Sequence, residues 1–207
     1  MKSITFTTSL LLLITLTFTS CSENKTSNNK KEVDVLKAED PLQEELDYLE
    51  LGKEIALKTK GNLGKYLIPA LGSFGSEGAL DICNTKAIQI TDSMAKELNA
   101  SIKRVSDKPR NQSNQANDSE LAYIQKWKES NENGESQGPE LLEIDGKIVG
   151  YYPIITNQMC IQCHGVPMED INKATLAKIN TLYPNDKATG YKSDEIRGLF
   201  VVGMDKK

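Results

Sequence analysis

The stretch LLEIDGKIVGYYPII, residues 141–155, decides the expected fold class. Two apolar runs in it are separated by Asp145-Gly146, a dipeptide that favours a two-residue turn between antiparallel strands. The stretch therefore predicts a β-hairpin of Leu141–Ile144 and Lys147–Ile155. Because an isolated hairpin is only marginally stable in water, other strands and helices must cover it.

Helical periodicity on the amino-terminal side of the hairpin supplies the first covering elements. A spacing of three and four residues predicts a helix from Ser76 onward, with an apolar face of Leu80, Cys83, Ala87, Ile90 and Met94. An earlier helix is predicted to begin at Asp40-Pro41, with an apolar face of Leu42, Leu46, Leu49 and Ala56. Glycines at 72, 75 and 78 predict a loop between these helices.

The remaining apolar patterns complete an α+β fold. Strands are expected at Ile102–Val105 and Leu199–Met204, and helices at Glu120–Glu129 and Glu169–Leu182. Together these elements predict a central antiparallel sheet with flanking helices, formed by residues 40–207 as one domain.

The amino terminus is predicted to be a targeting signal rather than structure. Lys2 and the uncharged run Ile4–Phe18 precede Cys21, so residues 1–20 resemble a bacterial lipoprotein signal peptide that is cut before that cysteine. Acylated Cys21 would then anchor the chain to a membrane. An ordinary secretory signal followed by an incidental cysteine is the alternative.

Residues 21–39 are rich in Asn, Lys, Ser, Thr and Glu, which predicts a flexible tether. We therefore expect a membrane-anchored lipoprotein that faces the periplasm or the cell surface. Ser22, directly after the cysteine, gives no inner-membrane retention signal, which slightly favours the outer membrane.

The composition excludes two kinds of function. The 207 residues include 25 basic and 29 acidic side chains, a net charge of −4, whereas an electrostatic nucleic-acid binder needs a basic surplus. The chain also has four cysteines and a single histidine, so no mechanism that requires two histidines is available.

That single histidine lies in the run CIQCH, residues 160–164, the pattern for attaching a c-type haem. Two thiols separated by two residues can form thioethers with the two vinyl groups of the porphyrin, which assigns Cys160 and Cys163 to covalent attachment. His164 then becomes the proximal ligand of the iron. One covalent haem c is the expected cofactor, and its attachment requires a compartment outside the cytoplasm.

Two other interpretations of the cysteines remain open. A thioredoxin-type dithiol usually opens a helix in a parallel βαβ unit, whereas a hairpin precedes Cys160. A Cys₃His zinc site could use Cys83, Cys160, Cys163 and His164, but adjacent side chains converge poorly on one tetrahedral ion.

The sixth iron ligand is not decided by spacing alone. With no second histidine, the candidates are Cys83, which lacks an evident disulfide partner, Met204 as runner-up, or an open site. An open site would suit an enzyme, a five-coordinate haem c with peroxidase-like activity. Arg104, Arg110 and Arg197 could assist there, or could pair with haem propionates.

Further short motifs resemble a bacterial family of c-type haem domains with a PAS-like fold, from about Leu46 to Val202. They are DICNTKA at 81–87, KRVS at 103–106, PRN at 109–111, YPI at 152–154, YPNDKATGY at 183–191 and IRG at 196–198. The resemblance implies ligation by the histidine of the attachment motif and by a cysteine on the early helix, which corresponds to Cys83.

A thiolate ligand stabilises ferric iron and lowers the reduction potential. The expected function is therefore a lipid-anchored monohaem c-type cytochrome in electron transfer or in redox or gas sensing, rather than an enzyme. Its expected partners are the membrane, through Cys21, and a redox or signalling protein. A diatomic gas is a candidate ligand, and nucleic acid is not expected.

Overall fold

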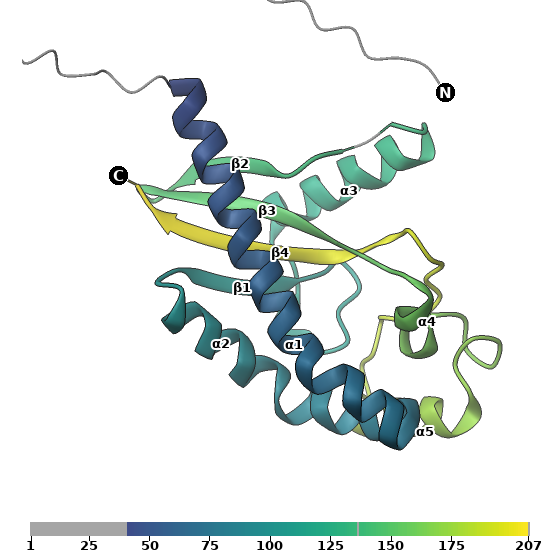
Figure 1. Ribbon diagram of the computed structural model, residues 1–207. Helices are drawn as coiled ribbons and strands as arrows, with labels where there is room; N and C mark the ends of the chain where they lie inside the picture. The colour runs from purple at the N-terminus through teal and green to yellow at the C-terminus, as the bar shows by residue number, and fades with distance from the viewer. Residues whose placement is uncertain (1–40, 136, 207) are drawn as a thin grey trace, which may run out of the picture. The chain divides into compact units, whose positions relative to one another are not determined.

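The computed structural model describes residues 41–135 and 137–206 (Figure 1). The predicted signal peptide, the tether and the acylated Cys21 lie outside the described residues. Within this part of the chain, no helix combines the length and the apolar character needed to cross a membrane.

Four antiparallel strands form one sheet in the order β1-β4-β3-β2. Their bounds are Ser101–Val105 (β1), Glu140–Ile144 (β2), Lys147–Ile155 (β3) and Ile196–Asp205 (β4). The predicted hairpin is confirmed: Asp145 and Gly146 join β2 to β3 with φ values of 51° and 74°, the positive angles that such a turn requires. The predicted α+β fold with a central antiparallel sheet is confirmed as well.

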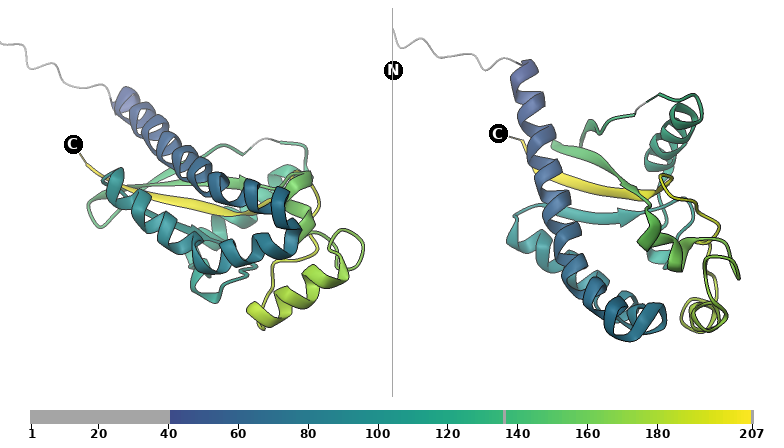
Figure 2. Two further views of the ribbon diagram at one scale, coloured as in Figure 1. Left: turned by 60° about the horizontal axis from the view of Figure 1, so that its bottom comes forward. Right: turned by 45° about the vertical axis from the view of Figure 1, so that its right-hand side comes forward.

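Helices cover both faces of this sheet. Their bounds are Pro41–Thr85 (α1), Ala87–Glu97 (α2), Asp118–Glu132 (α3), Gln158–His164 (α4) and Lys173–Leu182 (α5), with a short 3₁₀ turn at Gln112–Asn114. α1 and α2 pack on one face and α3 on the other, as the two views of Figure 2 show. The strand β4 is therefore buried on both sides: Phe200 and Val202 face α1 and α2, while Leu199 and Val201 face α3.

The first helix differs from its prediction in length and in orientation. α1 continues through Gly61 and Gly64, and its helical conformation breaks only at Gly75 (φ 65°, ψ −171°), so the predicted loop is reduced to one residue. The predicted apolar face was wrong for Leu42 and Leu46, which are 64% and 47% exposed, and right for Ala56, which is buried. The buried face of this part of α1 consists of Tyr48, Gly52, Ile55, Ala56 and Thr59.

The close approach of α1 to the sheet explains which face is buried. A Cβ atom at Gly52 would collide with the Tyr152 side chain, so only glycine fits there. The Tyr152 hydroxyl donates to the carbonyl oxygen of Leu49 at 3.2 Å. The helical face predicted around Leu80, Ile90 and Met94 is confirmed, since all three are buried.

Candidate functional site

The CIQCH run forms α4, a short helix that directly follows β3 and that the sequence patterns did not predict. Asn157 caps it: its Oδ1 accepts from the backbone N–H groups of Met159 and Cys160 at 3.0 and 3.2 Å. In a helix, residues three apart share a face, so the cap presents the side chains of Cys160 and Cys163 on one side. Both thiols are free and partly exposed.

His164, the last residue of α4, has a defined tautomer. Its Nδ1 lies 2.8 Å from the carbonyl oxygen of Ala188, which can only accept, so Nδ1 carries the proton. The Nε of Arg197, 3.3 Å from the same nitrogen, is then an electrostatic neighbour rather than a hydrogen-bond donor. Burial, Arg197 and Arg110 hold the pKa of His164 well below its usual value of 6.5. The ring is therefore neutral, with an unprotonated Nε2 that can bind a metal.

Arg110 connects the segment after α5 to α4, the helix that carries the attachment motif. Its Nη2 donates to the carbonyl oxygens of Cys163 at 2.6 Å and of Ala188 at 3.3 Å. The same guanidinium forms an ion pair with Asp186, with contacts of 3.2 and 3.1 Å, and both side chains are less than 10% exposed. Asp186 also accepts from the backbone N–H of Ala188 at 2.9 Å. The carbonyl that orients His164 is thus fixed from two sides.

Arg197 and Tyr191 enclose the other side of the His164 ring. Arg197 donates from Nη1 to the Ser106 hydroxyl at 2.8 Å, and its guanidinium lies 5.4 Å from the centre of the Tyr191 ring. The Tyr191 ring meets the His164 ring edge-on, with centres 6.4 Å apart. No role was predicted for Tyr191, Ser106 or Asp186, although they lie in the motifs at 103–106 and 183–191.

Cys83, at the carboxyl-terminal end of α1, lies within electrostatic reach of the attachment helix. Burial raises the pKa of the Cys83 thiol, while the charges of Arg110 and Arg104 oppose that rise. Burial raises the pKa of Cys163 to about 11; the charge of Arg110 opposes this rise, and a negative charge on Cys83 adds to it. The fold therefore brings together a cysteine and an attachment motif that are far apart in the sequence.

The site has more positive than negative charge. Of the guanidiniums of Arg104, Arg110 and Arg197, only that of Arg110 has a carboxylate partner among the described residues. The Arg104 guanidinium makes no hydrogen bond or ion pair within this part of the chain, and partial burial lowers its pKa. Buried charge of one sign is unfavourable unless an opposite charge offsets it, so the arrangement suits an anionic ligand.

Met204, the runner-up ligand, lies elsewhere. It is 3% exposed in the core between the sheet and the pair of helices α1 and α2, and it pairs with Ile148. It follows Arg197 by seven residues along β4, which corresponds to about 23 Å in an extended strand. Cys83, by contrast, is electrostatically coupled to Cys163, the residue before His164.

The zinc arrangement considered from the sequence is not assembled. In residues 41–135 and 137–206, no three side chains of His, Cys, Asp or Glu come close enough together to hold a metal ion. Cys83, Cys160, Cys163 and His164 are all within this part of the chain, and they do not form a tetrahedral set.

Fold and site together define an α+β protein that carries a Cys-X-X-Cys-His helix beside a four-stranded antiparallel sheet. The chain belongs to the Tll0287-like family, whose model matches residues 15–204. Among solved structures it is similar to one described as the crystal structure of the cyanobacterial heme-protein Tll0287. The TM-score is 0.54 at 16% identity, over 81% of this chain and 98% of that one, which shows a shared fold. None of the curated proteins matches the chain.

Proposed function

We propose that this chain is a PAS-like haem c protein with thioether bonds at Cys160 and Cys163. In each bond, the cysteine Sγ joins one carbon of a vinyl group and the thiol hydrogen goes to the other carbon, so no oxidant is needed. The observation that carries the proposal is the hydrogen bond from His164 Nδ1 to Ala188. It leaves Nε2 free at the position where the attachment motif needs the proximal ligand.

The charge distribution of the site fits this group. A haem has two propionate carboxylates, and the half-buried guanidiniums of Arg104 and Arg197 form no ion pair with a described carboxylate. The relative with a similar fold is described as a heme-protein, which agrees with the proposal.

Cys83 is the proposed second axial ligand. Burial raises the pKa of its thiol, while the nearby charges of Arg110 and Arg104 oppose that rise and would favour a thiolate bound to iron. A bound haem iron supplies one-electron chemistry between its ferric and ferrous states. With His164 and the Cys83 thiolate as its two protein ligands, such an iron would have a low reduction potential. Such a site suits electron transfer, or sensing in which a change of redox state releases Cys83.

The proposed location is the outer face of a membrane, reached through acylated Cys21. The apolar run Ile4–Phe18 before this cysteine supports an exported lipoprotein, and covalent haem attachment also requires export. The proposed partners are accordingly the membrane and a redox or signalling protein.

Expression with a haem-maturation system tests the cofactor. We expect a band that retains haem on a denaturing gel and a low-spin ferric spectrum with thiolate character. Cys83→Ala should convert the iron to a high-spin or exogenously ligated form, whereas Met204→Leu should leave the spectrum unchanged. Colourless protein would refute the haem assignment. A high-spin spectrum of the unaltered protein would instead favour the five-coordinate alternative.

A further inference from the structure

The last part of α1, residues 76–85, lies beside α5 and runs in the same direction (Figure 1). The Ser76 hydroxyl is 2.5 Å from the Thr175 hydroxyl, and Lys178 forms an ion pair with Asp81 at 2.7 Å. These two contacts join residues that are 99 and 97 positions apart in the sequence. Because this separation is nearly constant, the two helices are parallel and each turn of one lies beside a defined turn of the other.

That register brings Tyr183 next to Cys83. Leu80 and Ile179 belong to one buried apolar cluster between the two helices. Cys83 comes three residues after Leu80, and Tyr183 comes four residues after Ile179, so both side chains continue the faces that meet in this cluster. Burial raises the pKa of Tyr183 to about 12, and a negative charge on Cys83 adds to that rise, in agreement with their proximity.

Tyr183 is held in place by its backbone and not by its hydroxyl. Its N–H donates to the carbonyl oxygen of Ile179 at 2.8 Å, and its own carbonyl oxygen accepts from the N–H of Asp186 at 2.9 Å. Asp186 is paired with Arg110, which also donates to the carbonyl oxygen of Cys163. Within the described part of the chain the Tyr183 hydroxyl makes no hydrogen bond. Its position is therefore fixed relative to α4, while its phenolic O–H remains available to donate.

We propose that Tyr183 is a positioning residue for the sixth iron ligand, and that its hydroxyl donates a hydrogen bond to Sγ of Cys83 when this sulfur is bound to iron as a thiolate. The inference rests on the proposed function and assigns a role to the first residue of the motif at 183–191. Such a bond fixes the direction of the sulfur and reduces the negative charge that the sulfur gives to the iron. Hydrogen bonds to a sulfur ligand are among the factors that set the potential of an iron centre.

Tyr183→Phe, which removes only the hydroxyl, tests this role in the haem-loaded protein. We expect the ferric–ferrous equilibrium to shift at least threefold towards the ferric form, which is about 30 mV for one electron. The thiolate-to-iron charge-transfer band should move to longer wavelength, because a sulfur without the hydrogen bond gives up an electron more readily. Covalent haem content should equal that of the unaltered chain.

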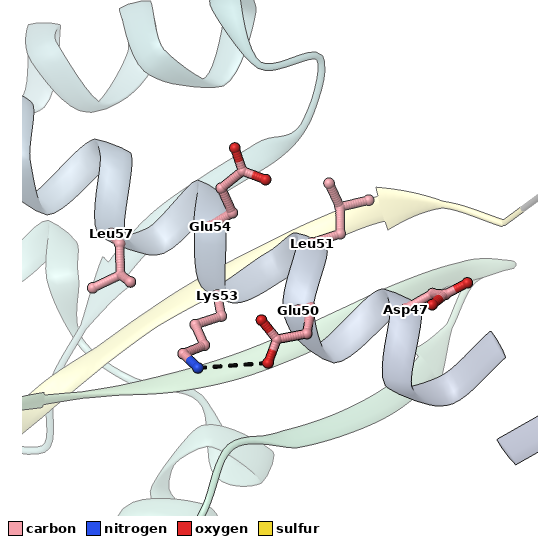
Figure 3. A pocket seen from close by; sticks show the side chains of 6 residues that line it. All are labelled: Asp47, Glu50, Leu51, Lys53, Glu54 and Leu57. Carbon is pink, nitrogen blue, oxygen red and sulfur yellow. Dashed lines mark ion pairs between the residues drawn. The ribbon is translucent and has the colours of Figure 1, made fainter. Parts of the chain in front are cut away.

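Three control variants separate the hydrogen bond from other effects. Thr175→Val removes a buried hydroxyl from the same helix interface, so it should lower stability without moving the band. Tyr66→Phe removes an exposed hydroxyl from α1 and should change neither band nor potential. Lys53→Gln removes the exposed ion pair with Glu50, drawn as a dashed line in Figure 3, and should likewise change neither because solvent screens such charges.

The outcomes distinguish this inference from the proposed function. An unchanged band and potential in Tyr183→Phe, with haem attached, would overturn the inference and leave the haem proposal intact. Loss of haem from Tyr183→Phe, or an equal displacement of the band in Thr175→Val, would also overturn it, since either result indicates a structural role. An unaltered chain that lacks haem, or whose haem spectrum has no thiolate character, would refute the proposed function and this inference with it.

Discussion

The guanidinium of Arg110 and the carbonyl oxygen of Cys163 are 2.6 Å apart, although 53 residues separate them in the chain. This contact joins the loop after β1 to the carboxyl-terminal turn of α4. Because the same guanidinium is paired with Asp186, one buried cation connects three segments that are distant in sequence. The orientation of His164 thus depends on tertiary structure as much as on its own helix.

Replacing Arg110 should be strongly destabilising. In Arg110→Gln the buried carboxylate of Asp186 loses its partner, a change that typically costs about 3–5 kcal/mol. Denaturant unfolding should show that loss. The control Lys126→Gln breaks an ion pair with Glu140 that is largely exposed, and it should cost less than about 1 kcal/mol. Equal effects in both variants would contradict the structural role of Arg110.

Removing the charge of Arg197 should lower the reduction potential of the proposed haem. Its Nε lies 3.3 Å from His164 Nδ1, so its positive charge disfavours the ferric state. We expect Arg197→Gln to lower the potential on the order of 60 mV, about a tenfold change for one electron. Arg197→Lys should retain most of the potential. A redox titration measures both, and an unchanged potential in Arg197→Gln would show that the charge has no such influence.

Stability should fall at alkaline pH because of Tyr152. Burial raises the pKa of this phenol above its usual value of 10, so the folded state favours the neutral form. The stabilisation is present below about pH 10 and is lost as the pH rises through the folded pKa, since the unfolded chain ionises first. Denaturation midpoints measured from pH 8 to 11 should fall less steeply in Tyr152→Phe. The slope for Tyr66→Phe, an exposed control, should equal that of the unaltered chain.

Two glycines of α1 should respond to alanine in opposite ways. Gly52→Ala forces the Tyr152 side chain to move and should destabilise the fold by about 1–3 kcal/mol. Gly61→Ala meets no atom of the same chain and should stabilise the monomer by about 0.5–1 kcal/mol. Thermal unfolding at low protein concentration measures both. Destabilisation by Gly61→Ala under these conditions would mean that its surroundings are more crowded than described.

Helices and turns that are specified by residues close together in the sequence were predicted correctly. The turn at Asp145-Gly146 and the apolar face that contains Ile90 and Met94 are examples, because each is specified by neighbouring residues. The side of α1 that packs on the sheet was predicted only in part, with Ala56 right and Leu42 and Leu46 wrong, because it depends on a contact between residues distant in sequence. Its leucines form the more obvious stripe, but the approach allowed by Gly52 decides which face is buried.

The candidate site likewise contains residues that the sequence pattern predicts and residues that it does not. Spacing alone singled out Cys160, Cys163 and His164, because the attachment pattern lies within five residues. Arg110 and Asp186 form an ion pair although they are 76 residues apart in the sequence, and no periodicity indicates such a pair. The capping of α4 by Asn157 could have been anticipated, since asparagine is a preferred first residue before a helix.

The non-helical backbone at Gly75 divides α1 into two helical arms. With φ at 65° and ψ at −171°, this residue occupies a backbone region that is essentially restricted to glycine. The long arm before Gly75 carries Leu57, and the short arm after it carries Cys83. The direction of the second arm relative to the first, and with it the position of the Cys83 thiol, therefore depends on the backbone angles of one residue.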